Sequence, residues 1–299
     1  MRAGALAAAL ALTGCCFGPI ELPAIELPTI ELPTIELPAI GGPPVELGTV
    51  AYPTGTPLTD ARRHVWSAAL LPPTYAAGYA LSASEAEGDL DAFHDWADSI
   101  GYRETGDGGF VYRATRGCMN GLACAQRFLA TRDRVDLQPL AGLFLARAQT
   151  SGWNAVDLAT LVLAFVQEIE YRLPTGEPFG IIPPATVAAR GWGDCDSKSM
   201  LAVVLLQEVG IDAVLLESQA HRHGAVGIAV PATGTSVTYE GRRYAYGETT
   251  VRGWPIGRAP PAMLTPPNDW TVELIPREAP RPSSEGGSGR RRGRRRSTD

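Results

Sequence analysis

The sequence GWGDCDSK, residues 191–198, is the part of this chain that says most about its fold and chemistry. Its cysteine, Cys195, follows a glycine-rich turn and precedes a strongly apolar segment that predicts a helix. Further along the chain, His221 and His223 lie in one strand-like segment and Glu248 lies in another. A thiol nucleophile needs an imidazole base and an acid that orients the base. The order cysteine, histidine, acid therefore predicts a cysteine-dependent acyl-transfer enzyme.

The segments around this stretch predict an α+β fold. Apolar residues recur at helical spacing in several of them, and Asn154 is a good N-cap for one helix. Alternating patterns and turn residues, among them Glu240 and Gly241, predict strands. The expected helices are Ser82–Gly101, Leu137–Thr150, Asn154–Tyr171 and Ser197–Val209; the expected strands are Gly109–Ala114, Ile211–Leu216, Gly224–Val230, Ser236–Glu240 and Arg243–Thr249, and His64–Leu71 is either a strand or a short helix. A helix bearing the cysteine would thus pack on an antiparallel β-sheet bearing the histidine and the acid.

The residues next to Cys195 have opposing effects on its thiol. A helix N-terminus favours the thiolate, because free N–H groups and the positive end of the dipole face the sulfur. Asp194 and Asp196 oppose this by their charge, although Asp194 could instead cap the helix. Lys198 is the only lysine in the chain, which reflects either a bias in composition or a role in stabilising the thiolate. No cysteine or histidine group has zinc-like spacing, so we expect no metal.

Four short motifs resemble a known family. The motifs GDC, GIDAV, HGAVGI and YGETT, which begin at residues 193, 210, 223 and 246, are similar to those of the bacterial transglutaminase-like superfamily of papain-fold cysteine enzymes. The likeness covers roughly residues 135–275. In that family the histidine directly precedes a small residue and an apolar strand, which matches His223 better than His221.

The resemblance implies a papain-like core and a Cys195–His223–Glu248 triad. Cys195 would attack an amide carbonyl of a peptide or protein substrate and form a thioester, with no cofactor. His223 would move the proton and Glu248 would fix its tautomer. The family's acid is commonly Asp, and Glu-Thr-Thr is a variant of its bacterial branch. Trp192 either forms a wall of the acyl site or packs in the core.

The N-terminus predicts export and a lipid anchor. Residues 1–14 have one arginine, a short apolar run and small residues, which is typical of a signal peptide, and the run is too short to span a bilayer. Leu-Thr-Gly-Cys resembles the lipobox of bacterial lipoproteins, with Cys15 as the lipidated residue; Cys16 fits less well. Ile-Glu-Leu-Pro then repeats four times, and its prolines predict an extended spacer over residues 15–49. We therefore expect a protein of the bacterial cell envelope, held at the outer membrane and facing the periplasm.

The rest of the chain divides into three expected parts. Residues 50–134 form an α/β region of unknown role, 135–279 a catalytic domain and 280–299 a disordered tail. The tail carries Arg290–Arg296, which either binds an anionic cell-envelope polymer or has no specific role. Because the net charge is −6 and the basic residues of the tail leave an acidic body, nucleic acid is not expected. Cys118 and Cys124 are candidates for a disulfide in an oxidising compartment.

The leading hypothesis is a membrane-anchored, cysteine-dependent amide hydrolase or acyl transferase. Hydrolysis is favoured over transfer because water is abundant and no amine-acceptor site is evident in the sequence. The alternative is a catalytically inactive transglutaminase-like scaffold that binds a peptide or cell-wall polymer. A third possibility is a tether whose tail binds an anionic polymer.

Overall fold

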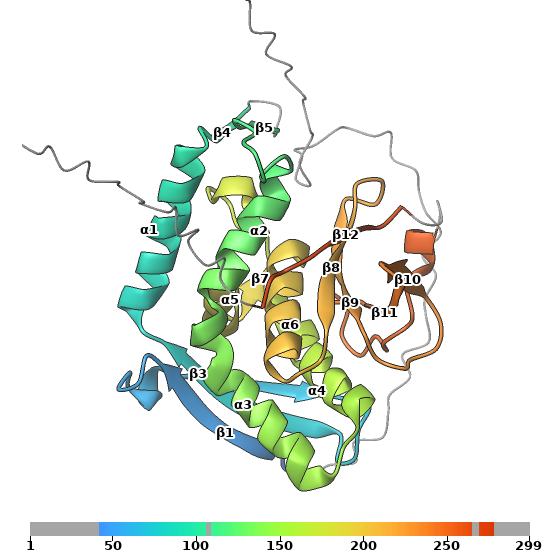
Figure 1. Cartoon of the computed structure of the whole chain (residues 1–299). Helices are drawn as coiled ribbons and strands as arrows, with labels where there is room; N and C mark the ends of the chain where they lie inside the picture. Colours follow the sequence, from blue (N-terminus) through green and yellow to red (C-terminus); the bar gives the residue numbers. More distant parts are fainter. Residues whose placement is uncertain (1–41, 106–108, 265–268, 278–299) are drawn as a thin grey trace, which may run out of the picture.

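The computed structural model describes residues 42–105, 109–264 and 269–277, which form an α+β fold (Figure 1). The expected fold class is confirmed at this level. The expected signal peptide, the lipidated Cys15, the proline-rich repeats and the arginine-rich tail lie outside the described residues.

A three-stranded sheet is formed by β1 (Val45–Tyr52), β2 (Arg62–Ser67) and β3 (Thr74–Leu81). The strand order is β1-β3-β2, with β1 parallel and β2 antiparallel to β3. Helices α3, α4 and α5 pack against these strands. The expected spacer, which extended to residue 49, was wrong at its end because β1 begins at Val45 and pairs with β3 from Tyr75 onward.

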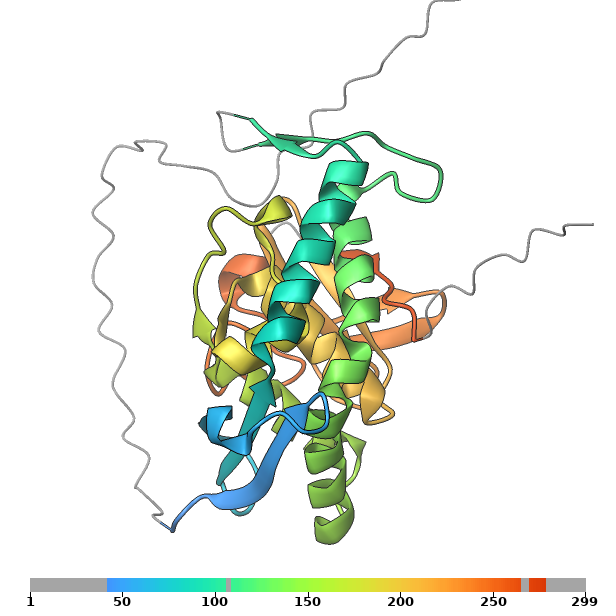
Figure 2. The ribbon, with the colours of Figure 1, turned by 90° about the vertical axis from the view of Figure 1, so that its left-hand side faces the viewer.

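Six α-helices lie in the described part of the chain. They are α1 (Ala83–Ser99), α2 (Gly121–Arg132), α3 (Arg134–Ser151), α4 (Ala155–Glu168), α5 (Pro184–Arg190) and α6 (Cys195–Glu208); short 3-10 turns occur at Leu58–Asp60, Pro178–Gly180 and Pro261–Leu264. Helices α1 and α2 run side by side (Figures 1 and 2). Helix α6 is buried over its whole length up to Gln207. It contacts α3, α4, α5, β8 and β9, which makes it the centre of the core.

A five-stranded antiparallel sheet completes the fold. It comprises β8 (Ala213–Ser218), β9 (His223–Ile228), β10 (Ser236–Tyr239), β11 (Arg242–Gly247) and β12 (Thr271–Glu273), in the order β10-β11-β9-β8-β12. One face packs on α6, and the other carries a smaller apolar cluster that includes Tyr244, Tyr246 and Leu216. The pairs β4 (Arg103–Glu104) with β5 (Phe110–Val111), and β6 (Glu170–Tyr171) with β7 (Trp192–Gly193), form two short sheets.

Several element boundaries differ from those expected. Helix α4 ends at Glu168 and not at Tyr171, because the chain turns there to pair β6 with β7. Helix α6 begins at Cys195 and not at Ser197, because Asp194 is its N-cap. The capping box at Asn154 is present, and Glu240 and Gly241 form the β10–β11 turn with positive φ angles of 47° and 77°.

Two further features bear on the environment of the domain. Cys118 and Cys124 are joined by a disulfide, with their Cα atoms 5.7 Å apart. No helix in the described ranges is long and apolar enough to cross a membrane.

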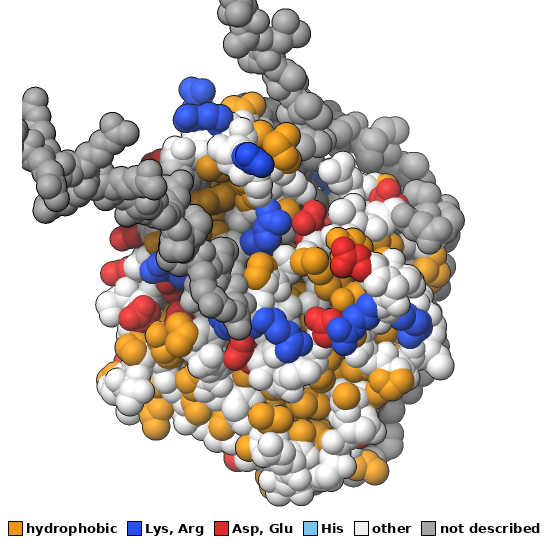
Figure 3. Space-filling model, viewed as in Figure 1, with side chains coloured by type: hydrophobic (Ala, Val, Ile, Leu, Met, Phe, Trp, Pro, Cys, Tyr) orange, Lys and Arg blue, Asp and Glu red, His pale blue; other side chains and the backbone are white. Residues whose placement is uncertain are grey.

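On the face drawn in Figure 3, the basic and acidic side chains that are described are interspersed among apolar ones and form no single basic patch.

Candidate active site

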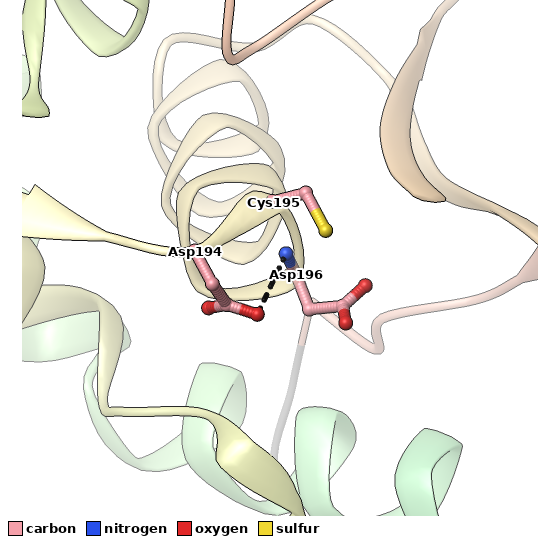
Figure 4. Close-up of side chains that lie close together, drawn as sticks. All are labelled: Asp194, Cys195 and Asp196. Carbon is pink, nitrogen blue, oxygen red and sulfur yellow. Dashed lines mark hydrogen bonds between the residues drawn. The ribbon is translucent and has the colours of Figure 1, made fainter. Parts of the chain in front are cut away.

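Cys195 is the first residue of α6. The side chain of Asp194 caps this helix by accepting hydrogen bonds from the backbone N–H groups of Ser197 at 3.0 Å and Asp196 at 3.4 Å (Figure 4). The Cys195 residue is only 6% exposed. The thiol is therefore held at the positive end of a buried helix, whose dipole favours the thiolate whereas burial disfavours it.

The two flanking aspartates oppose a thiolate less than their formal charges imply. Burial raises the pKa of Asp194 to about 6, although hydrogen bonds from Ser197 and the Asp196 N–H lower it. Burial, and then the charges of Asp194 and Glu217, raise the pKa of Asp196 well above its ordinary value. Asp196 is therefore protonated, and neutral, at a pH where an ordinary carboxyl would be charged.

His223 and Glu248 form a hydrogen-bonded pair. His223 is the first residue of β9, and its Nε2 lies 3.0 Å from Oε2 of Glu248, which follows β11. Tyr246 donates to the same oxygen at 2.7 Å, and the N–H and hydroxyl of Thr250 donate to Oε1 at 2.9 and 2.6 Å. Burial alone would raise the pKa of Glu248, but the bonds from His223 and Thr250 outweigh it and lower the pKa to about 2. Glu248 is thus a fixed carboxylate that orients the His223 ring.

Close packing brings this pair beside the start of α6. A Cβ at Gly224, the residue after His223, would overlap Oδ1 of Asp196, the residue after Cys195, and would lie 3.4 Å from its Cα. Ser199 of α6 hydrogen-bonds Thr249, next to Glu248, at 3.1 Å. The segments that carry the cysteine, the histidine and the acid therefore lie directly against one another.

Gln167 and Lys198 are two buried polar residues that support this arrangement. Gln167 donates to the backbone oxygens of Glu248 and Trp254, both at 2.8 Å. Lys198 is fully buried, and its Nζ donates to the Ile169 oxygen at 2.6 Å. Burial lowers the pKa of Lys198 to about 8, while the charges of Glu248 and Cys195 act in the opposite direction.

The accessory residues expected from the sequence have different surroundings. His221 lies in the turn before β9, not in a strand with His223, and its ring is 6.1 Å from that of Trp270. Its Nε2 has no hydrogen-bond partner among the described residues. Trp192, in β7, packs against the main core and lies under the Arg172 guanidinium at 5.0 Å. Of the two histidines, His223 is the one that pairs with Glu248, whereas His221 lies beside Trp270.

A cavity of about 560 Å³ lies next to the paired residues. Its lining includes Tyr246, Trp270, Val237 and Met263. The Trp270 ring lies edge-on to Tyr246 at 5.3 Å and to His223 at 6.4 Å.

Two groups of side chains have the spacing of metal ligands. The ligand atoms of Asp194, Cys195 and Asp196 lie within 4.8 Å of one another, and so do those of Glu85, Asp89 and Asp136. Buried acidic groups of this kind can also share protons, and their spacing alone establishes no metal site.

Sequence patterns indicated some of these partners and not others. The shared strand face of Tyr246 and Glu248 was visible as a spacing of two residues. The role of Gln167 was not visible in the sequence, although a glutamine within an apolar helix is a signal for a buried hydrogen bond.

Comparison of the chain with protein-family models, curated proteins and solved structures finds no match.

Proposed function

We propose that this protein is a cysteine-dependent amide hydrolase or acyl transferase with a transglutaminase-like, papain-like core. The observation that carries the proposal is the His223–Glu248 pair at 3.0 Å, packed against the helix that begins with Cys195. Because Nε2 of His223 is bonded to Glu248, Nδ1 is the ring nitrogen left to exchange a proton with a thiol.

The proposed reaction proceeds through a thioester. Sγ of Cys195 attacks the carbonyl carbon of a peptide amide, and backbone N–H groups at the start of α6 stabilise the oxyanion. The C–N bond then breaks, and the leaving amine takes the proton from the His223 imidazolium. Water, activated by His223, attacks the thioester, releases the acid and restores the thiol. Attack by an amine in place of water would give transfer.

The test is the rate at which Cys195 reacts with iodoacetamide as a function of pH. The full chain is labelled without reductant, and peptide mapping by mass spectrometry assigns the label among its five cysteines. We expect rapid labelling with a midpoint well below the ordinary thiol pKa of about 8.5. In His223→Ala the rate at pH 7 should fall by up to roughly 30-fold, because a thiol with the ordinary pKa of about 8.5 is only about 3% ionised at that pH. His221→Ala is the matched control and should react like the wild type.

The deep burial of Cys195 favours one alternative, an inactive scaffold that binds a peptide or polymer. That alternative predicts slow labelling, an ordinary midpoint and no effect of His223→Ala. A severe loss in His221→Ala alone would contradict the assignment of the base.

A further inference from the structure

The five-stranded sheet has a free edge at β10. This strand is the last in the sheet order and pairs only with β11 in the described part of the chain (Figure 1). The Tyr246 N–H donates to the Thr235 oxygen at 3.0 Å, and in an antiparallel pair such bonds recur at every second residue. The N–H and C=O groups of Ser236 and Thr238 therefore point away from β11, and no described residue bonds them. A free edge of this kind is a template for an added strand.

The cavity of about 560 Å³ borders this edge. Its lining includes the four consecutive residues 235–238. Successive side chains of a strand point to opposite faces of the sheet, so four residues in a row can border one cavity only where the cavity also meets the backbone. The cavity therefore adjoins both the apolar face of the sheet and the unpaired groups of the β10 edge.

Two aromatic rings connect the cavity with the His223–Glu248 pair. Tyr246 lines the cavity, and its hydroxyl donates to Glu248 at 2.7 Å. Trp270 also lines it, and the ring centroids of Trp270 and His223 are 6.4 Å apart. Burial, and then the charges of Glu248 and Cys195, raise the pKa of Tyr246, so its hydroxyl is within electrostatic reach of the thiol. The cavity thus shares its walls with the candidate active site.

The described lining of the cavity carries no charged side chain. It consists of apolar and aromatic side chains with a few hydroxyls, and its members outside β10 are Tyr246, Met263, Leu264 and Trp270. Such walls, around a volume of about 300–1,000 Å³, are typical of ligand pockets. An aromatic side chain gains contacts with the two rings and the thioether here. A charged side chain would lose its hydration and find no partner of opposite charge among these residues.

We propose that this cavity binds an aromatic side chain of a peptide substrate whose backbone pairs with the free edge of β10. This inference rests on the proposed function, because it names the substrate class of the same site. Because an extended peptide advances about 3.3 Å per residue, the 6.4 Å between the Trp270 and His223 rings corresponds to about two residues. The bound side chain therefore belongs to a residue near, but not at, the amide that Cys195 attacks.

The edge and the cavity have separate tasks in this binding mode. Main-chain hydrogen bonds to Ser236 and Thr238 supply affinity for an extended peptide of any sequence, and the cavity selects the side chain. The two contributions can therefore be removed one at a time.

The test compares peptide alkylating agents that differ in one side chain, which is that of phenylalanine, alanine or glutamate. In bromoacetyl-Ala-Xaa-Ala-amide this side chain lies on the leaving-amine side of the site, and in acetyl-Ala-Xaa-Ala chloromethyl ketone it lies on the acyl side. Rates at Cys195 of the full chain are measured by peptide mapping and divided by the rates with N-acetylcysteine. In one of the two series we expect the phenylalanine probe to react faster than the alanine probe by roughly tenfold or more, the effect of burying an aromatic side chain. The glutamate probe should react no faster than the alanine probe.

A larger side chain at Val237 tests the cavity. Val237→Trp fills it, so the ratio of the phenylalanine rate to the alanine rate should fall to about one. Val65→Trp, at an exposed position of β2, is the matched control and should keep the ratio of the wild type. Urea unfolding of both variants shows that they are folded.

A proline at Thr238 tests the edge. Because the Thr238 N–H points away from β11, Thr238→Pro removes an edge donor and no hydrogen bond of the sheet. Relative to iodoacetamide, the phenylalanine and alanine probes of the favoured series should both react roughly two- to tenfold more slowly, the effect of one hydrogen bond. Thr238→Ala, which keeps the N–H, is the control and should react like the wild type.

The outcomes separate this inference from the proposed function. Slow labelling by iodoacetamide and by every peptide probe, with an ordinary thiol midpoint, would contradict the proposed function itself. A reactive thiol with no preference for phenylalanine in either series, or a preference unchanged in Val237→Trp, would overturn the binding site alone. Equal rates in Thr238→Pro and Thr238→Ala would overturn the pairing with β10.

Discussion

Lys198 has an unusual place for the only lysine of a chain. Its ammonium lies in the interior, bonded to a backbone oxygen, where desolvation disfavours its charge. It interacts electrostatically with both Cys195 and Glu248. This interaction is mutual, so a cationic Lys198 favours the Cys195 thiolate.

Lys198→Met should therefore move the midpoint of Cys195 alkylation to higher pH. At a pH below both midpoints the rate should fall by roughly tenfold, the equivalent of one pKa unit, and the rate at pH 10 should be nearly unchanged. The pH profile of iodoacetamide labelling measures this. Lys198→Arg, which keeps the charge, is the control for the midpoint. An equal loss at every pH would show a structural role and contradict the electrostatic one.

At the scale of elements, the contact between α6 and β9 depends on the small size of Gly224. An alanine there would overlap the Asp196 carboxyl and crowd the backbone of α6. We expect Gly224→Ala to destabilise the protein by about 1–3 kcal/mol, the usual cost of overpacking, and to slow labelling of Cys195. Urea unfolding measures the free energy.

The matched control for this substitution is Gly142→Ala. Gly142 is exposed within α3, and a Cβ there meets no atom within 4 Å. This change should stabilise the protein by about 0.5–1 kcal/mol, because alanine is the better helix former. Equal effects of the two substitutions would contradict the packing argument.

The same elements explain what the sequence could predict. The helix at Cys195 and four strands of the five-stranded sheet, β8 to β11, have strong local patterns, a cap at Asp194 and a turn at Glu240, so their positions were predicted to within a few residues. The fifth strand, β12, was not predicted. Strand β1 was missed because its stability comes from pairing with β3, a contact distant in sequence. Strand β3 was missed because its run of alanine, glycine and tyrosine, buried on both faces, has no alternation.

The residues of the candidate site also differ in whether a local sequence pattern points to them. Cys195, His223 and Glu248 could be proposed as site residues from the sequence because each lies in a short motif. The burial of Asp196 and Gln126 depends on how α2 and α6 pack together, which no local pattern records. Their type alone would place them at the surface.

For the whole molecule, buried carboxyls set the dependence of stability on pH. Burial raises the pKa of Asp136 and Glu217 to about 7 and that of Asp194 to about 6, and raises those of Asp133 and Asp196 well above their ordinary value. In unfolded chains such groups titrate near 4. Between pH 4 and 7 the folded state therefore binds more protons than the unfolded state, and stability falls as pH rises.

Other groups make stability rise with pH, but they are fewer or they titrate in other pH ranges. Burial lowers the pKa of His64 to about 4, so this histidine gains stability as pH rises from 4 to about 6.5. Glu248, with its pKa near 2, contributes stability above its ordinary pKa that is lost only below about pH 4.5. The lowered pKa of Lys198 affects stability only above about pH 8, where the unfolded chain binds this proton more tightly and stability rises with pH.

We therefore expect the protein to be more stable at pH 5.5 than at pH 8, with a higher midpoint in urea. Glu217→Gln mimics the protonated carboxyl, so this variant should gain stability mainly at pH 8 and show a smaller difference between the two conditions. Glu87→Gln, at an exposed position of α1, is the control and should leave the difference in urea midpoint between pH 5.5 and pH 8 unchanged. A midpoint that rises from pH 5.5 to 8 would mean that these carboxyls are ionised in the folded protein.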